Sequence, residues 1–290
     1  MSPAHTTAPS EPLIRNISDT ARWIAFHRAE ETDRPDALFR DPYARKLAGQ
    51  RGEDIARQMA GPGGDWSQPL RTYLFDRAIL SAIQAGADTV LNLAAGFDTR
   101  PYRMPLPKSF QWIEVDLPDL LAEKEEALRA EEPACRVERV RLDLSDVSGR
   151  QALFARVCAS ARSVLIVSEG LLAYLPAAEV VSLARDLATP QSFRTWVLDM
   201  MSPGLLKLLT KAWAGRFDKS GSRLQFAPVE GPGFFEPLGW KPAEVRGLLK
   251  AAAQARRLPF LLRIVALLPE PSGKQGDRPW GGVCVFNRSV

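Results

Sequence analysis

The 290-residue sequence contains few cysteines and histidines, and this scarcity excludes several classes of protein. Cys135, Cys158 and Cys284 lie far apart and form no C-x-x-C pair. An odd, sparse set of this kind gives no disulfide framework and suits a reducing compartment. His5 and His27 are the only histidines, so we expect no zinc site and no other metal.

Long apolar runs and blocks of like charge are also missing. No run reaches the roughly 18 apolar residues of a membrane span, so we expect no membrane partner. The 38 basic and 34 acidic residues leave a net charge of only +4, without a basic block and interleaved aromatics. This pattern does not favour nucleic-acid binding. The first dozen residues lack the basic-then-apolar plan of a secretory signal, and we expect a cytoplasmic protein.

The chain instead shows an alternation of apolar runs and helical stretches. Residues 17–69 are helical in pattern and end at a segment rich in glycine and proline. Five short apolar runs then occupy 88–93, 110–116, 135–144, 162–170 and 193–200. Helical stretches over 117–132, 150–161 and 176–188 separate the later runs. The alternation predicts an α/β fold, a Rossmann-like, mainly parallel sheet with helices on both faces.

The alternation of apolar runs and helical stretches ends after Met201, where the sequence becomes rich in aromatic residues, glycine and proline. We expect a cap or lid over residues 201–240, a helix over 241–258 and a last strand over 280–288. The predicted organisation is a disordered tail (1–16), an N-terminal helical segment (17–69), a core (70–200), the cap (201–240) and a C-terminal helix and strand that complete the core (241–290). The 46% hydrophobic content suffices for one large core.

The first strand runs into a turn with a single glycine, in VLNLAAGFDTR. Asp116 ends the second strand 20 residues beyond Gly96, the spacing at which a carboxylate accepts hydrogen bonds from a ribose diol. A pyrophosphate would require several glycines and backbone amides, whereas the negative charge of Asp98 in this turn would repel an anion. These features favour a phosphate-free, cationic nucleoside, and S-adenosylmethionine (SAM) meets that description.

Further side chains at the strand ends have candidate roles in such a site. Asp143 is placed to meet the adenine amino group while Leu144 packs on the ring. Glu169 is placed to face the ammonium group of the ligand, and Arg71 is available for its carboxylate. The alternative for any one strand-end acid is a helix cap or a solvated turn, which is the role we expect for Asp146 and for Asp119.

Four stretches, NLAAGFDTRPYRM, EVDLPDLLAEKEEAL, SEGLLAYLP and FFEPLGW, together resemble the leucine carboxyl methyltransferase family. They are most similar to its bacterial branch, which includes O-methyltransferases of polyketide and other natural-product pathways. ISDTARWIAFHRAEET and FRDPYARKLAG extend the resemblance from about residue 17 to the C-terminus. It implies the class I SAM-dependent methyltransferase fold.

The resemblance also implies roles for individual residues. Arg71 would bind the SAM carboxylate with the basic residue Arg22 nearby, Gly96 would contact the amino-acid portion, Asp116 the ribose, Asp143 and Leu144 the adenine, and Glu169 the ammonium end. Ala94 departs from the family, which often has glycine there. Alanine is tolerated at this position if its backbone does not require a positive φ. The resemblance does not identify the methyl acceptor, because residues 201–240 match the family only in FFEPLGW.

The expected function is SAM-dependent O-methyl transfer to a carboxylate or phenolic hydroxyl of a small molecule, in secondary metabolism. The alternatives are a methyltransferase for protein C-terminal carboxyl groups and a SAM-binding module without catalysis. The missing glycines disfavour an NAD-dependent dehydrogenase. A carboxylic acid with a pKa near 4 needs no base, whereas a phenol near pKa 10 would benefit from one.

Two residues are candidates for the acceptor side of the site. His27 is the candidate base, with a packing or surface role as the alternative. Tyr174 is a candidate acceptor contact, with a role in the core as the alternative. For Arg100 and Arg103 we expect structural contacts at the turn, rather than the steering of an acidic acceptor.

Overall fold

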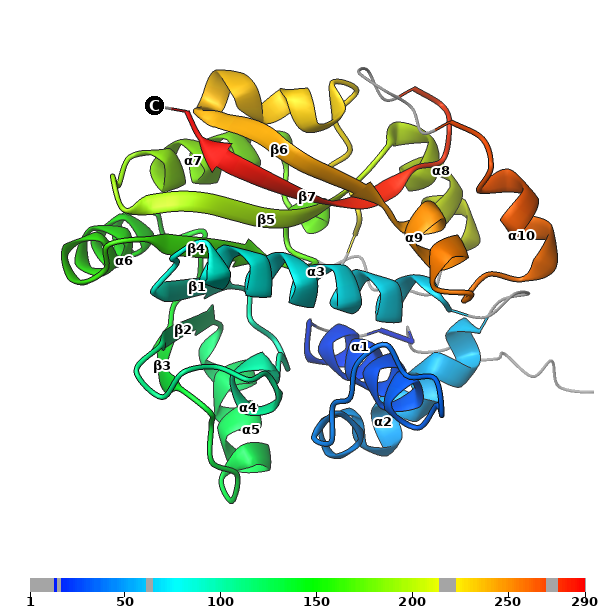
Figure 1. Cartoon of the computed structure of the whole chain (residues 1–290), viewed down its shortest axis with the longest axis horizontal. Coiled ribbons are helices and arrows are strands. Elements are labelled where there is room, and N and C mark those ends of the chain that lie inside the picture. The colour runs from blue at the N-terminus through cyan, green and yellow to red at the C-terminus, as the bar shows by residue number, and fades with distance from the viewer. Residues whose placement is uncertain (1–12, 15–16, 61–64, 214–222, 270–275, 290) are drawn as a thin grey trace, which may run out of the picture.

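A seven-stranded sheet of order β3-β2-β1-β4-β5-β7-β6 forms the centre of the molecule (Figure 1). The computed structural model describes residues 13–14, 17–60, 65–213, 223–269 and 276–289. The strands are β1 (Thr89–Leu93), β2 (Gln111–Asp116), β3 (Arg136–Arg141), β4 (Val164–Ser168), β5 (Phe193–Met201), β6 (Trp240–Gly247) and β7 (Gly281–Arg288). Strands β1 to β5 pair in parallel, and β7 is antiparallel to both β5 and β6. The predicted α/β sheet is confirmed.

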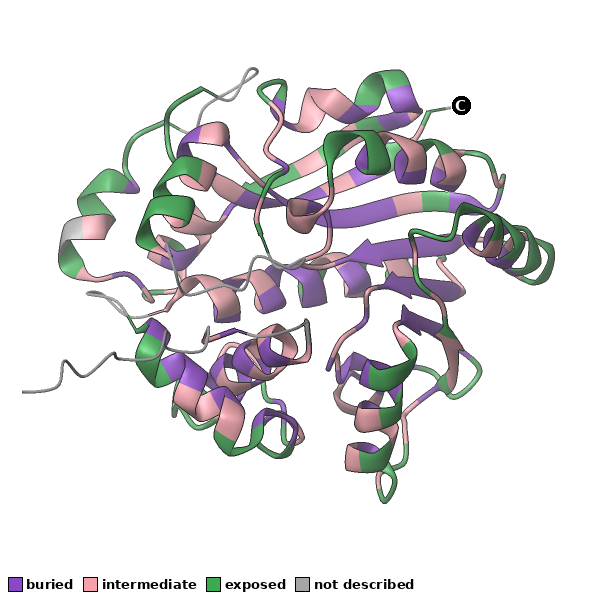
Figure 2. Ribbon diagram, turned by 180° about the vertical axis from the view of Figure 1, so that it is seen from behind, coloured by how far each residue is buried: buried purple, intermediate pink, exposed green. Residues whose placement is uncertain are grey.

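Helices cover both faces of this sheet, because side chains alternate between the faces along each strand. On one face, α3 (Ser67–Gln84) packs Phe75 and Ile79 against Val90 of β1. On the other, α6 (Val147–Ser160) and α7 (Ala177–Ala188) pack against Leu91 and Ile166. The short helix α4 (Arg100–Arg103) and α5 (Pro118–Leu128) follow β1 and β2. Figure 2 shows that the buried residues run through the sheet and the inner helix faces.

Two N-terminal helices, α1 (Ile17–Thr32) and α2 (Ala44–Met59), pack against each other beside the sheet. Gly52 makes their close approach possible, since a Cβ at this position would lie 2.6 Å from the carbonyl oxygen of Arg22. Ile14 is fully buried against these helices with Trp23 and Ile55. The predicted tail of residues 1–16 is therefore wrong at Ile14, while its residues 1–12 and 15–16 lie outside the described residues.

The predicted helix over 241–258 is half wrong, because the first part of this stretch is the edge strand β6. Its pairing with β7 comes from a segment about 40 residues further on, which local helix propensity does not register. Pro242 is tolerated because an edge strand can leave one hydrogen-bonding side unpaired. Helices α9 (Leu248–Gln254) and α10 (Phe260–Val265) follow.

The predicted cap over 201–240 divides into two parts with different surroundings. Helix α8 (Pro203–Ala212) lies near α9 and α10 at the edge of the molecule (Figure 1). The 3₁₀ segment η2 (Gly231–Leu238) instead belongs to the core, where buried Phe235 stacks edge-on against Trp196. Residues 214–222 lie outside the described part. No helix in the described ranges is long and apolar enough to cross a membrane.

Candidate functional site

A cavity of about 960 Å³ lies at the carboxyl ends of the five parallel strands. In an open parallel sheet this is where ligands bind, since the loops after the strands surround a crevice there. The cavity walls include residues at or after the carboxyl ends of β1, β2, β3, β4 and β5, namely residues 94–98, 116–117, 142–145, 169–171, 173–175 and 199–201. Seven of the nine site residues expected from the sequence line it: Arg71, Gly96, Asp116, Asp143, Leu144, Glu169 and Tyr174.

The turn after β1 is held against the end of β2. Gly96 has a φ of 48°, and its backbone N–H donates to Asp116 Oδ2 at 2.6 Å. Asp116 Oδ1 accepts from the Leu117 N–H at 2.8 Å. Burial raises the pKa of this carboxyl, and the two backbone hydrogen bonds oppose the shift. Each carboxylate oxygen has a further lone pair, so Asp116 can accept hydrogen bonds from a diol in the cavity.

The turn also shows that one departure from the family has a cost. Ala94 has a φ of 54°, so the condition under which alanine is tolerated at no cost is not met. A left-handed conformation at a non-glycine residue costs about 1 kcal/mol or more. The structure holds the strained residue on the cavity wall, directly after β1.

Asp143 and Leu144 line the cavity beyond β3. Asp143 is exposed, and its Oδ1 accepts from the Ser145 N–H at 2.8 Å. Asp146 caps α6 by accepting from the Gly149 N–H, which confirms the role expected for it. Asp119 lies in the first turn of α5, where an acidic side chain is favourable.

A chain of ion pairs joins the ends of β4 and β5 to α3 and α4. Arg71 Nε donates to Glu169 Oε1 at 3.1 Å, and Arg71 Nη1 donates to Asp199 Oδ2 at 3.3 Å. Arg100 donates to Glu169 Oε2 at 2.7 Å and to Asp98 Oδ2 at 3.0 Å. Asp199 was not predicted from the sequence. It is an acidic residue near the end of a strand, β5, and this is the same signal that identified Glu169.

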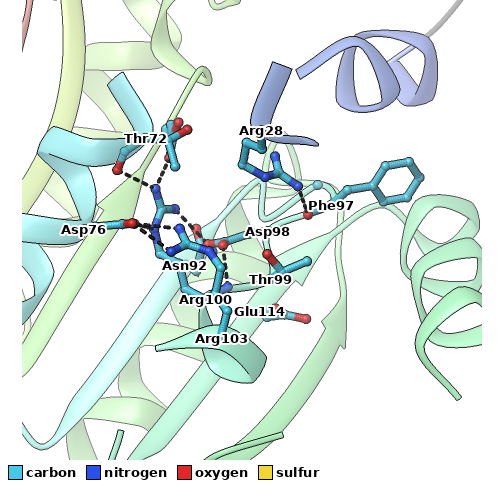
Figure 3. Close-up of polar contacts among 12 residues, drawn as sticks. Arg28, Thr72, Asp76, Asn92, Phe97, Asp98, Thr99, Arg100, Arg103 and Glu114 are labelled. Atoms are coloured by element: carbon cyan, nitrogen blue, oxygen red, sulfur yellow. Dashed lines mark hydrogen bonds and ion pairs between the residues drawn. The ribbon is translucent and has the colours of Figure 1, made fainter. Parts of the chain in front are cut away.

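Figure 3 shows how Arg100 lies at the centre of this cluster, between α3 and the turn after β1. Its guanidinium also donates to Asp76, which Arg103 contacts from the other side at 2.8 Å through each Nη. Arg100 is 3% exposed. Both arginines therefore make the structural contacts at the turn that the sequence led us to expect.

The cluster contains more carboxyl groups than guanidinium groups, and burial raises the pKa of one of these carboxyls, Asp199. Asp76, Asp98, Glu169 and Asp199 face the three guanidinium groups of Arg71, Arg100 and Arg103. Burial by itself raises the pKa of Asp98, but Arg100, Lys124 and Arg103 lower it to about 2. For Glu169, Arg100 and Arg71 likewise overcome burial and lower the pKa. These two carboxylates stay ionised at neutral pH, which makes this wall attractive to a cation.

The cluster also leaves hydrogen-bonding capacity for a ligand. Gln68 Oε1 and Thr72 Oγ1, one turn of α3 apart on the cavity wall, are buried without a hydrogen-bond partner among the described residues. Most buried polar atoms in native proteins do have a partner. With Asp116 and the charged cluster, they give the wall a donor and acceptor set that fits a nucleoside bearing an amino-acid group.

Arg22 does not line the cavity. One end of its guanidinium donates to the Leu47 carbonyl at 3.2 Å and the other pairs with Glu123. Arg28, one and a half turns further along α1, lies on the cavity wall instead. It donates to the Phe97 carbonyl at 2.6 Å and to Asp41 at 2.8 Å, so it fixes the turn after β1 (Figure 3).

His27 is also absent from the cavity wall. Its two ring nitrogens pair with Glu30 at 3.0 Å and with Asp65 at 3.2 Å. Burial lowers the pKa of His27, but the two carboxylates outweigh it and raise the pKa to about 9. A protonated imidazole with both nitrogens engaged has no lone pair with which to accept a proton. This arrangement does not support a base at His27.

Tyr174 lines the cavity close to Arg71 and Asp199. It belongs to the short 3₁₀ segment η1 (Leu172–Tyr174), which begins three residues after Glu169. Burial raises the pKa of its hydroxyl, with Asp199 acting in the same direction and Arg71 against it. The phenol therefore stays protonated at neutral pH and can donate a hydrogen bond into the cavity.

The opposite part of the cavity is apolar. Its walls come from the end of β5, from α8, α9 and α10, and from the residue before β7, and include Met200, Leu205, Leu209, Leu248, Leu262 and Trp280. Trp66 and Trp213 also line it, whereas Trp240 is fully buried in the core. Apolar walls with a few polar groups at one end are typical of small-molecule sites.

Solved structures share this architecture. A DUF574 family protein from Streptomyces avermitilis superposes with a TM-score of 0.56 at 15% identity, over 93% of this chain and 97% of that one. A “putative methyltransferase” from Thermobifida fusca gives 0.55 at 15% identity, over 99% and 100%. The sheet order and these neighbours confirm the predicted Rossmann-like α/β fold.

The family model for leucine carboxyl methyltransferase matches residues 21–188. A Frankia alni protein named “Putative S-adenosyl-L-methionine-dependent methyltransferase” is 31% identical over 265 residues, 82% of this chain and 88% of its own. A protein of the same name from Mycobacteroides abscessus is 35% identical over 190 residues, 60% of this chain. That match spans only 62% of the relative's length. The chain belongs to the leucine carboxyl methyltransferase family.

Proposed function

We propose that this protein is a SAM-dependent methyltransferase that methylates an oxygen of a small molecule, in secondary metabolism. The observation that carries the proposal is the division of one cavity into two parts. One wall combines Gly96, Asp116 and an excess of carboxyl groups, and the other is apolar. Family membership supports the same chemistry.

Each part of SAM has a candidate partner on the polar wall. Asp116 would accept hydrogen bonds from the ribose, and Asp143 with Leu144 would hold the adenine. Arg71 would bind the carboxylate, Glu169 would face the ammonium group, and Gly96 would let the backbone approach. When bound, SAM supplies an activated methyl group on a sulfonium, which an acceptor oxygen takes in an in-line displacement.

The residues of the chain contribute by binding, positioning and the exclusion of water. An acceptor oxygen must be held about 3–3.5 Å from the methyl carbon, and the apolar wall excludes competing water. Tyr174, five residues after Glu169 in the chain and on the same cavity wall, would donate a hydrogen bond to the acceptor.

The acceptor group that fits best is a carboxylate. No histidine is among the described residues that line the cavity, and a carboxylate needs no base because it is already ionised at neutral pH. A phenol would require a base to remove its proton. We therefore expect the product to be a methyl ester.

The test is transfer of a radiolabelled methyl group from SAM to a panel of aliphatic and aromatic carboxylic acids, phenols and peptides with free C-termini. Mild alkali then releases labelled methanol from an ester but not from an aryl ether. We expect a methyl ester of a small carboxylic acid, which releases labelled methanol. The variant Asp119→Ala is the active control and should transfer the label like the wild type. Alkali-stable label on a phenol would overturn the expected methyl ester but not methyl transfer to an oxygen. Label on peptides alone, or SAM binding without any transfer, would overturn the proposal of a small-molecule methyltransferase.

A further inference from the structure

Large apolar side chains are exposed along α10 and the turn that follows it. Phe260 is 74% exposed, Ile264 57% and Leu267 83%. Their spacing of four and then three residues puts them on one side of the helix and its continuation. Helix α10 forms the outer edge of the molecule in Figure 1, and most of it is exposed in Figure 2.

The same segment forms part of the cavity wall. Leu262 and Ala266 turn inward, and both line the cavity. Val265, Leu268 and Leu208 of α8 line the cavity as well, although they are 46%, 51% and 50% exposed. Residues that belong to both the cavity wall and the outer surface mark its opening. Exposed lining residues also occur elsewhere on the wall, at Asp143, Ser145 and Glu179. One opening therefore lies between α8 and α10 and has a largely apolar rim.

Basic residues predominate in the two segments that border this opening. Residues 203–213 and 248–269 contain six basic residues and no acidic one. Lys207 and Arg257 pair with acids from elsewhere in the chain. The other four, Lys211, Lys250, Arg256 and Arg263, form no ion pair with any residue in the described ranges. This surface combines projecting apolar side chains with unbalanced positive charge.

We propose that the surface of α8 and α10 docks onto an anionic lipid bilayer. This α8–α10 surface is formed by the apolar residues Leu208, Phe260, Ile264, Val265, Leu267 and Leu268 and by the basic residues Lys211, Lys250, Arg256 and Arg263. Apolar side chains beside basic ones are the features by which a helix lies in a membrane interface. A bilayer offers a fluid apolar phase to side chains that project, whereas a protein partner would need a groove shaped for each of them. The contact is peripheral, so it requires no membrane-spanning helix.

Docking places this opening of the cavity at the lipid surface. An amphiphilic acceptor dissolved in the bilayer can then enter through the apolar rim without passing through water. This last step rests on the proposed methyl transfer, whereas the docking does not. Vesicle binding is measured without any acceptor, so failure of the chemistry and failure of the docking are separate results.

The experiment is flotation of the full chain with vesicles of phosphatidylcholine containing about a third phosphatidylglycerol, compared with pure phosphatidylcholine. We expect binding to the anionic vesicles, weakened by salt because charge contributes to it. The double variant F260S/L267S should reduce the vesicle partition coefficient about tenfold or more, because two large side chains no longer enter the bilayer. Arg263→Glu should reduce it several-fold.

The matched control is the double variant V229S/V245S, which removes two exposed apolar side chains elsewhere and should bind vesicles like the wild type. Affinity for SAM should be unchanged in all these variants, which reports that the fold is intact. Absence of binding to anionic vesicles overturns the proposal. It is also overturned if the wild type is a dimer that F260S/L267S dissociates, because a second copy of the chain then covers the surface.

Discussion

The two halves of the cavity differ in how their walls are stabilised. On the polar half, buried guanidinium and carboxylate groups hold one another in a chain that runs from Asp76 through Arg100 and Glu169 to Asp199. On the apolar half, short helices supply side chains that share few polar contacts and remain partly exposed. We therefore expect the first half to hold a ligand of defined charge in a fixed position, and the second to adapt by shape to the methyl acceptor that we propose.

The largest expected effect comes from removing the central cation of the polar half. Arg100→Ala leaves the buried Asp76, Asp98 and Glu169 with one guanidinium fewer. Breaking a buried ion pair on one side costs about 3–5 kcal/mol, because a charge stays buried without compensation. We expect a loss of this size in the free energy of unfolding, measured by urea denaturation, together with loss of SAM binding.

The matched control is Arg77→Ala, on the exposed side of α3, where the guanidinium contacts only the Tyr73 ring and hydroxyl among the described residues. It should change the free energy of unfolding by less than about 1 kcal/mol. If Arg100→Ala were as mild as Arg77→Ala, the polar half would not be the rigid part of the cavity.

The second effect concerns His27 of α1, which lies off the cavity wall but pairs with Asp65, a residue of that wall. The pKa of His27 is raised from 6.5 to about 9, so its ion pairs contribute stability that is fully present below about pH 6.5. That stability is lost as the pH rises through about 9, up to about 3 kcal/mol for a shift of this size.

We expect the free energy of unfolding of the wild type to fall between pH 6.5 and 9 relative to that of His27→Gln, in chemical denaturation at a series of pH values. Parallel profiles for the two proteins would show that His27 is not held as a cation. Methyl transfer should survive in His27→Gln, because the imidazole lies off the cavity wall.

The difference between the halves also explains what could be predicted from the sequence. Gly96, Asp116 and Glu169 lie at or within three residues of strand ends. Parallel strands end at one edge of the sheet, so local patterns suffice to bring these residues together. Arg22 and Arg28 both lie on α1, and only the rotation of that helix against the sheet decides that Arg28 lines the cavity. Strand β6 depends on pairing with β7, a non-local contact that outweighs the helical pattern of 241–258.

A smaller effect is expected at Asp116, where the polar half should meet the ribose. Asp116→Ala removes two acceptor oxygens from a buried position, and we expect SAM to bind at least about tenfold more weakly by calorimetry. Because the same oxygens accept the Gly96 and Leu117 N–H groups, thermal unfolding of the variant must be measured alongside. Asp119→Ala, three residues away and exposed, should bind SAM like the wild type. Equal affinities of the two variants for SAM would show that the ribose does not bind at the end of β2.

The smallest effect should separate the two halves most cleanly. Leu209 lines the apolar half and is partly buried, so Leu209→Ala removes contact area from the acceptor without touching the charged cluster. For whichever acceptor takes up label, we expect KM to rise about fivefold, on the order of 1 kcal/mol for the lost side-chain contact. The affinity for SAM should stay within about twofold, since sites without shared partners contribute independently. A matching loss of SAM affinity would mean that the two halves are coupled, and the acceptor wall would then help to order the cofactor site.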